Sequence, residues 1–487
     1  MSDYKIETEC VQGGYKPKSG EPRVLPIVQS TTYKYDSAAD VGDLFDLKKE
    51  GFFYTRLANP TLDAVEKKIA ALEGGVGAVL TSSGQAANLF AILNITCAGQ
   101  NIVASPAIYG GTVNLFAVTL KKMGIEVRFC SPEMSEEEVD SLIDDNTRLI
   151  FGETIANPAL KIFDIEKYAK IAHKNGIPLV VDNTFATPIL CRPFDFGADI
   201  VVHSTTKYMD GHATSVGGVV VDGGRFDWEN GKFPELCEPD ESYHGIVYTK
   251  SFGNAAYLTK AKVQLMRDLG SIPSPMNAFL LNIGLETLHL RVPRHCENAL
   301  AVAKYLESDP RVTWVSYPGL ESSPDRELAK KYLPKGCSGV ISYGIKGGRE
   351  AAVKFMDSLK LAAIVVHVAD ARTSVLHPAS TTHRQLSDEQ LVACGIGPDM
   401  IRMSVGIENV EDIIADIKKQ GFTGKMSAKS PEYVVKKAFK RLDKNKFLCI
   451  PGGWNKFVYA LSKLAPTAIT ERVIAKKFRN KEKDAFG

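Results

Sequence analysis

The sequence lacks several features that would assign its class at once. Its 487 residues contain no apolar run near the roughly 18 residues of a membrane-spanning helix. Its polar N-terminus lacks the apolar core of a secretory signal. The nine cysteines form no CxxC pair and are odd in number, which disfavours a disulfide framework or a zinc site. We therefore expect a cytoplasmic protein with reduced, mostly buried thiols and no bound metal.

The net charge of +2 conceals an uneven distribution. Residues 425–487 carry 16 Lys or Arg and 5 Asp or Glu, a net of +11, which leaves −9 for residues 1–424. The acidic body lacks the positive field that nucleic-acid binding needs, so we expect no nucleic-acid partner. The basic end predicts a helical tail that packs on the protein itself, on another protein or on a membrane surface.

Short apolar runs alternate with amphipathic stretches between about residues 61 and 266. The predicted strands are GAVLTSS (77–83), NIVASP (101–106), RLIFGETI (148–155), PLVVDNTF (178–185) and ADIVVHSTT (198–206), with helices over 62–73 and 165–176. The runs are apolar throughout, as expected for strands buried on both faces. The alternation predicts an α/β fold with a parallel sheet covered by helices.

Four parts are expected along the chain. Residues 1–60, rich in turn formers and aromatics, predict an extended arm with short helices. Residues 61–274 predict the large sheet domain. Residues 275–424 predict a smaller α/β domain with a strand over 339–348 and a closing helix over 412–421. The basic helical tail, 425–487, comes last, and it weakly resembles the end of some short-chain dehydrogenases.

Residues suited to chemistry follow five of the predicted strands. In an open parallel sheet, ligands bind beyond the carboxyl ends of the strands. The residues at these ends are, in chain order, Ser83, Gly84 and Gln85, then Tyr109, Asn157, Asp182 and Thr184, and finally Ser204, Thr206 and Lys207.

These residue types suit the parts of a phosphorylated aldehyde cofactor. The helix that opens at Gly84 would hold a phosphate on its free N–H groups, and Tyr109 could stack on a flat ring. Asp182 could pair with a ring nitrogen, and Lys207 could form a Schiff base. Taken alone, each residue also fits an ordinary cap, turn or surface position. Together they predict a pyridoxal-phosphate pocket rather than a nicotinamide pocket, because no GxGxxG follows the first strand.

Over residues 5–424 the same motifs resemble a known family. DIVVHSTTKYMDGHATSVGG (199–218) is similar to the lysine signature of the Cys/Met-metabolism family of pyridoxal-phosphate enzymes, and YTRLANPT, SSGQAA, YGGT, VDNTFATP and IRMSVGIE also match. The resemblance implies a PLP-transferase fold of type I, with Lys207, Tyr109 and Asp182 as catalytic residues. It implies cofactor binding by Tyr54, Arg56, Ser83, Gly84, Gln85, Tyr109, Asn157, Asp182, Thr184, Ser204, Thr206 and Lys207.

The resemblance also implies how substrate and subunits are arranged. Asn157, Thr373 and Arg402 would bind the substrate, with Arg402 on its α-carboxylate. Tyr54 and Arg56 would reach the cofactor phosphate of a neighbouring subunit, which implies a homotetramer built from dimers with shared active sites.

Within the family, the segments 226–245, 267–291 and 367–390 resemble the O-acetylhomoserine sulfhydrylases. The implied reaction is a γ-replacement, in which sulfide or methanethiol takes the place of acetate on O-acetyl-L-homoserine to give homocysteine or methionine. The alternatives are cystathionine γ-synthase, γ-lyase or methionine γ-lyase activity, and a non-catalytic protein of this fold that acts through its tail.

Gly111 occupies the position at which methionine γ-lyases tend to carry a reactive cysteine, which favours the resemblance to the sulfhydrylases. Three positions depart from the sulfhydrylase pattern. His367 and Ala369 stand where sulfhydrylases more often have Asn and Gly, and Thr373 stands in place of a common Ser. These departures predict a shift in donor preference rather than a loss of function.

Overall fold

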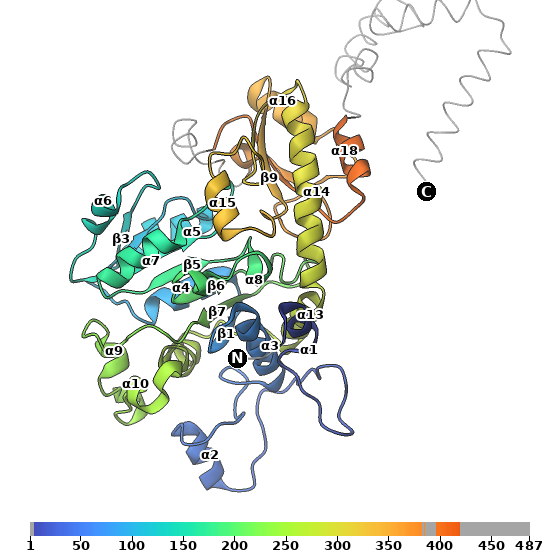
Figure 1. Cartoon of the computed structure of the whole chain (residues 1–487). Helices are drawn as coiled ribbons and strands as arrows, with labels where there is room; N and C mark the ends of the chain where they lie inside the picture. The colour runs from blue at the N-terminus through green and yellow to red at the C-terminus, as the bar shows by residue number, and fades with distance from the viewer. Residues whose placement is uncertain (1–3, 382–383, 385–395, 419–487) are drawn as a thin grey trace, which may run out of the picture. The chain divides into compact units, whose positions relative to one another are not determined.

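The computed structural model describes residues 4–381, 384 and 396–418. The predicted tail over 425–487 and most of the segment 382–395 lie outside these residues. Two β-sheets, each packed against helices, make up the described part of the chain (Figure 1). No helix within that part is long and apolar enough to cross a membrane.

The larger sheet has seven strands in the order β1-β7-β6-β5-β4-β2-β3. They are β1 (Gly77–Thr81), β2 (Asn101–Ala104), β3 (Glu126–Phe129), β4 (Thr147–Glu153), β5 (Leu179–Asp182), β6 (Ile200–His203) and β7 (Gly218–Asp222). All neighbours are parallel except β7, which is antiparallel to both β1 and β6. The five predicted strands are confirmed. The sequence did not predict β3 and β7, and β7 makes the sheet mixed.

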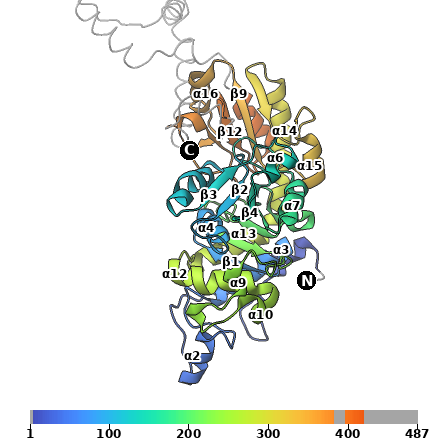
Figure 2. The same ribbon diagram turned by 90° about the vertical axis from the view of Figure 1, so that its left-hand side faces the viewer.

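Helices cover both faces of this sheet. The helix α3 (Pro60–Glu73) packs on β1, α4 (Gly84–Leu93) on β6 and β7, and α7 (Ile165–Lys174) on β4 and β5. The helices α4 and α7 lie on opposite faces (Figure 2). This follows from right-handed crossovers, because the connection from β1 to β2 and the connection from β4 to β5 advance across the sheet in opposite directions.

The smaller sheet has five strands in the order β10-β11-β12-β9-β8. They are β8 (Val312–Ser316), β9 (Val340–Ile345), β10 (Ala363–Ile364), β11 (Ser374–Leu376) and β12 (Met400–Ser404). Only β10 and β11 pair in parallel. The helix α14 (Leu288–Ser308) packs on β8 and β9, and α16 (Gly348–Met356) packs on β9 and β12. The strand predicted over 339–348 corresponds to β9, and the closing helix corresponds to α18 (Val410–Lys418).

Between the N-terminus and α3 the chain contains only α1 (Ile6–Gln12), α2 (Ala38–Phe45) and irregular segments within the described residues. The other α-helices within the described residues are α5 (Gly110–Asn114), α6 (Glu136–Asp140), α8 (Thr187–Leu190), α9 (Pro234–Cys237), α10 (Tyr248–Phe252), α11 (Ala256–Lys260), α12 (Arg267–Leu269), α13 (Pro275–Glu286) and α15 (Arg326–Tyr332). The predicted domain boundaries stay predictions, although α3 begins at Pro60 and α13 at Pro275.

Candidate active site

The candidate site lies at one edge of the larger sheet. Because β1 and β6 are both antiparallel to β7, β1 runs in the same direction as the five parallel strands. The carboxyl ends of six strands therefore meet at this edge. Asp182 is the last residue of β5, and Lys207 lies in the turn that follows β6. The sequence prediction that residues after these strands come together is thus met by the sheet order.

Asp182 is held at the end of β5 by Thr184. The Thr184 hydroxyl and backbone N–H both donate to Asp182 Oδ1, at 2.5 and 3.0 Å. The same hydroxyl accepts the Ser204 N–H at 2.8 Å, so it joins the ends of β5 and β6. Burial raises the pKa of Asp182, whereas the bonds from Thr184 and the nearby His203 oppose that rise. The second carboxylate oxygen, Oδ2, accepts no hydrogen bond from the described residues, so it can serve a ligand.

The start of α4 forms a narrow turn beside the end of β6. Ser83 caps the helix, and its hydroxyl accepts the Ala86 N–H at 3.2 Å. The N–H groups of Gly84 and Gln85 lie in the first turn, where no helical acceptor exists. A Cβ at position 84 would lie 2.6 Å from the Ser204 Cβ, so only glycine allows this approach. The Gln85 side chain donates to the Thr112 hydroxyl at 3.1 Å.

Lys207 is half-buried, and its environment favours the neutral amine. Burial, and then the positive charge of Arg402, lowers the pKa of Lys207 to about 8. The turn that carries Lys207 is fixed by Thr206, whose hydroxyl donates to the Gly217 carbonyl and accepts the Gly217 N–H, both at 3.1 Å. An amine with this pKa can exchange protons near neutral pH.

Arg402 enters the site from β12 of the smaller sheet. Its guanidinium donates to Asn157 Oδ1 and to the Val366 carbonyl, both at 3.2 Å. Burial lowers the pKa of Arg402 to about 10, and the neighbouring Tyr109 opposes that change. The two sheets thus bring together Asn157, Tyr109 and Arg402, as the sequence predicted. Arg402 makes no other hydrogen bond with the described residues, so the other three of its five guanidinium N–H groups can serve a carboxylate ligand.

Tyr109 is positioned by a carboxylate that the sequence analysis did not single out. Its backbone N–H donates to Glu153 Oε2 at 2.7 Å. Burial, and then the negative charge of Asp182, raises the pKa of Glu153 well above its ordinary value. The Tyr109 ring lies over Gly111, where a Cβ would be 2.5 Å from the ring carbon Cε1. A cysteine at position 111 would therefore displace Tyr109.

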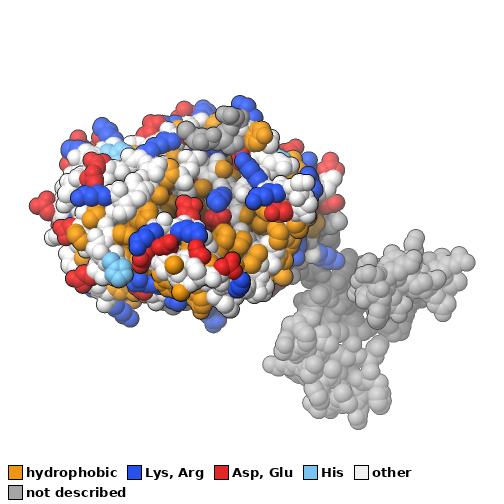
Figure 3. All heavy atoms as spheres, turned by 90° about the horizontal axis from the view of Figure 1, so that it is seen from below, with side chains coloured by type: hydrophobic (Ala, Val, Ile, Leu, Met, Phe, Trp, Pro, Cys, Tyr) orange, Lys and Arg blue, Asp and Glu red, His pale blue; other side chains and the backbone are white. Residues whose placement is uncertain are grey.

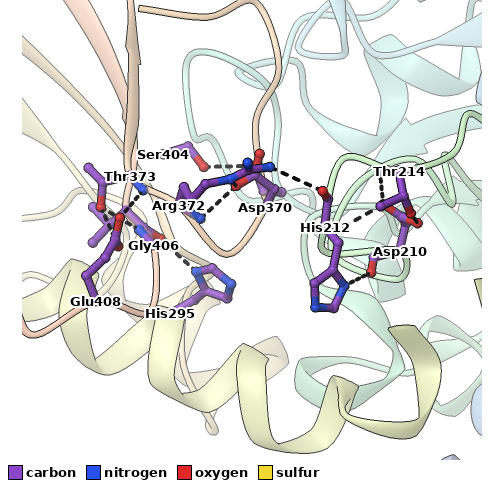
Figure 4. Close-up of polar contacts among 12 residues, drawn as sticks. Asp210, His212, Thr214, His295, Asp370, Arg372, Thr373, Ser404, Gly406 and Glu408 are labelled. Atoms are coloured by element: carbon purple, nitrogen blue, oxygen red, sulfur yellow. Dashed lines mark hydrogen bonds and ion pairs between the residues drawn. The ribbon is translucent and has the colours of Figure 1, made fainter. Parts of the chain in front are cut away.

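Within the described chain, Thr373 makes hydrogen bonds to Glu408 and Gly406. Its hydroxyl donates to Glu408 Oε2 and accepts the Gly406 N–H, both at 2.9 Å, and its own N–H donates to Glu408 Oε1 at 2.7 Å. Figure 4 shows this group beside Asp370 and Arg372. These contacts hold the connection that enters β11, and a contact of Thr373 with substrate stays a prediction.

The same connection contains Ala369, one of the three departures from the sulfhydrylase pattern. Ala369 has a φ of 69°, in the left-handed region that glycine adopts most easily. This conformation explains why sulfhydrylases more often have glycine there. The Ala369 N–H donates to the Ser404 hydroxyl at 2.7 Å, which holds the backbone in this shape.

Tyr54 and Arg56 contact each other and the segment around Arg267. Arg56 donates to the Arg267 carbonyl and lies over the Tyr54 ring at 5.3 Å from its centroid. Within the described chain, neither residue makes a hydrogen bond to the group around Lys207. Tyr54 is 42% exposed, so it is available to another subunit.

The residues at the sheet edge fit pyridoxal phosphate. The free N–H groups of Gly84 and Gln85, with the Ser204 hydroxyl beside them, suit a phosphate group. The open oxygen of Asp182 suits a protonated ring nitrogen. Lys207 supplies the amine at the same edge.

A comparison with protein families gives the same assignment. The model of the Cys/Met metabolism PLP-dependent enzyme family matches residues 7–423. The chain belongs to this family. The match stops before the predicted tail, so residues 424–487 lie beyond the part that family members share.

Two relatives are similar to most of the chain. The chain is 47% identical to a homocysteine synthase of Schizosaccharomyces pombe over 84% of this chain and 96% of the relative. It is 45% identical to an O-acetyl-L-homoserine sulfhydrylase of Leptospira meyeri over 86% of this chain and 96% of the relative.

A solved structure resembles the fold closely. A Campylobacter jejuni protein assigned as an O-acetylhomoserine (thiol)-lyase superposes with a TM-score of 0.83 at 37% identity, covering 85% of this chain and 99% of that chain. That protein carries a pyridoxyl-lysine phosphate residue. The PLP-transferase fold expected from the sequence is confirmed.

Proposed function

We propose that the protein replaces the acetate of O-acetyl-L-homoserine with sulfide or methanethiol, giving homocysteine or methionine. The similarity to homocysteine synthases and O-acetylhomoserine sulfhydrylases over most of their length carries this proposal. The arrangement of Lys207, Asp182 and Arg402 supports it.

Residues at the edge of the larger sheet bind the cofactor, and Arg402 of the smaller sheet binds the substrate. Pyridoxal phosphate, when bound, accepts the electrons released as bonds at the substrate's reacting carbons break. Gly84, Gln85 and Ser204 would hold the phosphate, and Asp182 would keep the ring nitrogen protonated. Arg402, oriented by Asn157, binds the α-carboxylate of the substrate and so fixes which way the amino acid lies.

Lys207 moves the protons. Its pKa of about 8 leaves part of the free amine neutral at pH 7 to 8, so it can take a proton from Cα and exchange protons at Cβ. Tyr109, which follows β2, would stack on the flat ring of the cofactor.

We infer that the arm completes the site of a second subunit, within a homotetramer. A groove of about 1200 Å³ runs beside the arm, with Leu44, Phe52, Phe53 and Val263 among its lining residues. Phe45 and Tyr54 are exposed near it. Figure 3 looks at the end of the molecule where α2 lies and shows exposed hydrophobic side chains among charged ones. Such a surface suits burial against another copy of the chain.

A comparison of three separate substrate mixtures tests the proposed reaction. Purified holoenzyme is given O-acetyl-L-homoserine with sulfide, O-acetyl-L-homoserine with cysteine, or methionine alone, and the products are separated. We expect homocysteine and acetate from the first mixture at the highest rate. A higher rate with cysteine would identify a cystathionine synthase. Ammonia and a 2-oxo acid from methionine would identify a lyase.

A cytoplasmic location fits the state of the thiols. All seven cysteines within the described residues are free, as a reducing compartment requires. We propose this location together with the proposed activity.

A further inference from the structure

One face of α14 carries three buried polar side chains. Arg291, His295 and Asn298 are spaced by four and then three residues, so they lie on the same face of the helix. None of the three is more than 5% exposed. Polar side chains at this depth need hydrogen-bond partners, and each of these donates to backbone carbonyls outside the helix.

Arg291 binds the turn that carries Lys207. Its Nη1 donates to the Tyr208 carbonyl at 2.8 Å, and its Nη2 donates to the Gly284 carbonyl at 2.6 Å. Tyr208 directly follows Lys207 in the chain. The turn lies close against the guanidinium, because a Cβ at Gly211 would overlap Nη1. Arg291 therefore fixes the backbone from which the Lys207 amine extends.

His295 and Asn298 bind the segment that follows β12. The His295 Nδ1–H donates to the Val405 carbonyl at 2.7 Å, and Asn298 donates to two further carbonyls of the same segment, both at 2.9 Å. Figure 4 shows His295 reaching from its helix toward the segment that contains Gly406. Val405 lies three residues after Arg402. These bonds therefore fix the end of the strand that carries the Arg402 guanidinium.

The bond to Val405 is the one hydrogen bond that the His295 imidazole makes with the described residues. Burial lowers the pKa of His295 to about 4, although the bond to Val405 opposes that change. The imidazole is therefore neutral at pH 7, with a single N–H. Because a carbonyl only accepts, that proton is on Nδ1, and Nε2 has no partner among the described residues. A side chain with one donor near Nδ1 would keep the contact.

Tyr208 joins the same two segments by a second path. Its hydroxyl accepts the Gly339 N–H at 2.8 Å, and the Gly339 carbonyl accepts the Val405 N–H at 2.7 Å. The Tyr208 ring also packs edge-on against His295, with the ring centroids 5.0 Å apart. The turn after β6, the helix α14 and the end of β12 thus form a closed set of contacts.

We propose that Arg291, His295 and Asn298 are positioning residues that set the spacing between Lys207 and Arg402. This inference rests on the part of the proposed function in which Arg402 holds the substrate's α-carboxylate. A helix rises about 1.5 Å per residue, so the three side chains span a stiff spacer about 10 Å long. With the carboxylate held, this spacing decides whether the Lys207 amine reaches the Cα proton. A displacement of about 1 Å can slow such a step about a hundred-fold.

Exchange of the α-proton measures this positioning without the full reaction. L-Norleucine has no leaving group, so holoenzyme in deuterated water can exchange its Cα proton but cannot eliminate a group from it. The Lys207 amine takes the proton from Cα, the bound cofactor accepts the electron pair, and a deuteron from solvent returns through the same amine. NMR gives the rate of exchange at saturating norleucine.

Two replacements of His295 and one control are compared with wild type. His295→Leu removes the donor at similar size, whereas His295→Asn keeps an amide donor near the position of Nδ1. Val302→Ala is the control, because it removes buried methyl groups from the same helix without removing a side-chain hydrogen bond.

We expect His295→Leu to slow the exchange by about ten-fold or more, and His295→Asn to recover most of the rate. The Kd of pyridoxal phosphate for the apoenzymes should stay within about two-fold of wild type. Val302→Ala should unfold at lower urea concentration but should exchange within about two-fold of the wild-type rate. Equal rates in wild type and His295→Leu, or equal slowing in Val302→Ala, overturn the inference.

Arg291→Lys tests the other end of the helix face, and it decides the matter if His295→Leu does not fold. Lysine keeps the charge but lacks the planar group that reaches several carbonyls, so we expect slower exchange here too. An unchanged rate in Arg291→Lys, or no exchange in wild type, contradicts the inference.

The exchange uses neither an acetyl ester nor a thiol, so the two proposals fail separately. If the variants slow the exchange as expected but O-acetylhomoserine and sulfide give no homocysteine, the proposed reaction fails. If homocysteine forms but the exchange does not respond to the variants, the role of the α14 residues fails.

Discussion

Replacing Thr373 with valine separates a structural role from a substrate-binding role. The change keeps the size and branching of the side chain but removes the hydroxyl. That hydroxyl donates to the Glu408 carboxylate and accepts the Gly406 N–H, and Thr373 is only 1% exposed. A hydrogen bond to a charged group contributes about 1.5–3 kcal/mol, and a buried N–H without an acceptor costs about 1–3 kcal/mol. Because Glu408 is half-buried and partly solvated, we expect Thr373→Val to lower the free energy of unfolding by about 2–4 kcal/mol.

Thr373→Ser is the matched control, because it keeps both hydrogen bonds and loses one methyl group, which costs about 1 kcal/mol. Urea unfolding of both holoenzymes gives the stabilities, and steady-state kinetics below the unfolding transition give KM for O-acetylhomoserine. We expect KM to stay within about two-fold in both variants. A ten-fold rise in KM for Thr373→Val without loss of stability would refute the structural role and support contact with substrate.

Two further predictions concern a buried acid and the arm. Burial raises the pKa of Asp222 to about 7 in the folded state. The unfolded chain ionises near pH 4, so stability is lost as pH rises from about 4 to 7, by up to about 4 kcal/mol. The free energy of unfolding is measured at pH 5 and at pH 8, and the decrease between these two values should be smaller in Asp222→Asn than in wild type. An equal decrease in both proteins would contradict the prediction. For the arm, inactive Arg56→Ala and inactive Lys207→Ala should regain activity when their subunits are mixed. Failure to regain activity in verified mixed oligomers would show that sites are not shared.

The apolar runs predicted five strands because burial on both faces leaves a local pattern. The strand β3 was missed because it lies at the sheet edge, where Glu126 is exposed and the other residues are half-buried. The strand β7 is fully buried, but no local pattern reports that it runs antiparallel to its neighbours. The sequence pattern therefore indicates which strands are buried, but it does not indicate in which direction a strand runs within the sheet.

The strand-end residues of the site were predictable because parallel strands bring their ends to one edge. Glu153 was missed because it lies within the apolar run of β4, and its partner, the Tyr109 N–H, is 44 residues away. The partners of Thr373 are likewise non-local, since Glu408 lies 35 residues farther along the chain. His367 was noticed only as a departure, and its closeness to Lys207 follows from the packing of the two sheets.

The most direct test of the account asks which lysine binds the cofactor. Holoenzyme is treated with borohydride, which fixes the cofactor to its lysine, and the digested protein is examined by mass spectrometry. We predict that the added mass lies on Lys207, and that Lys207→Ala carries no fixed cofactor and forms no homocysteine from O-acetylhomoserine and sulfide. Cofactor fixed to another lysine, or full activity in Lys207→Ala, would contradict the account.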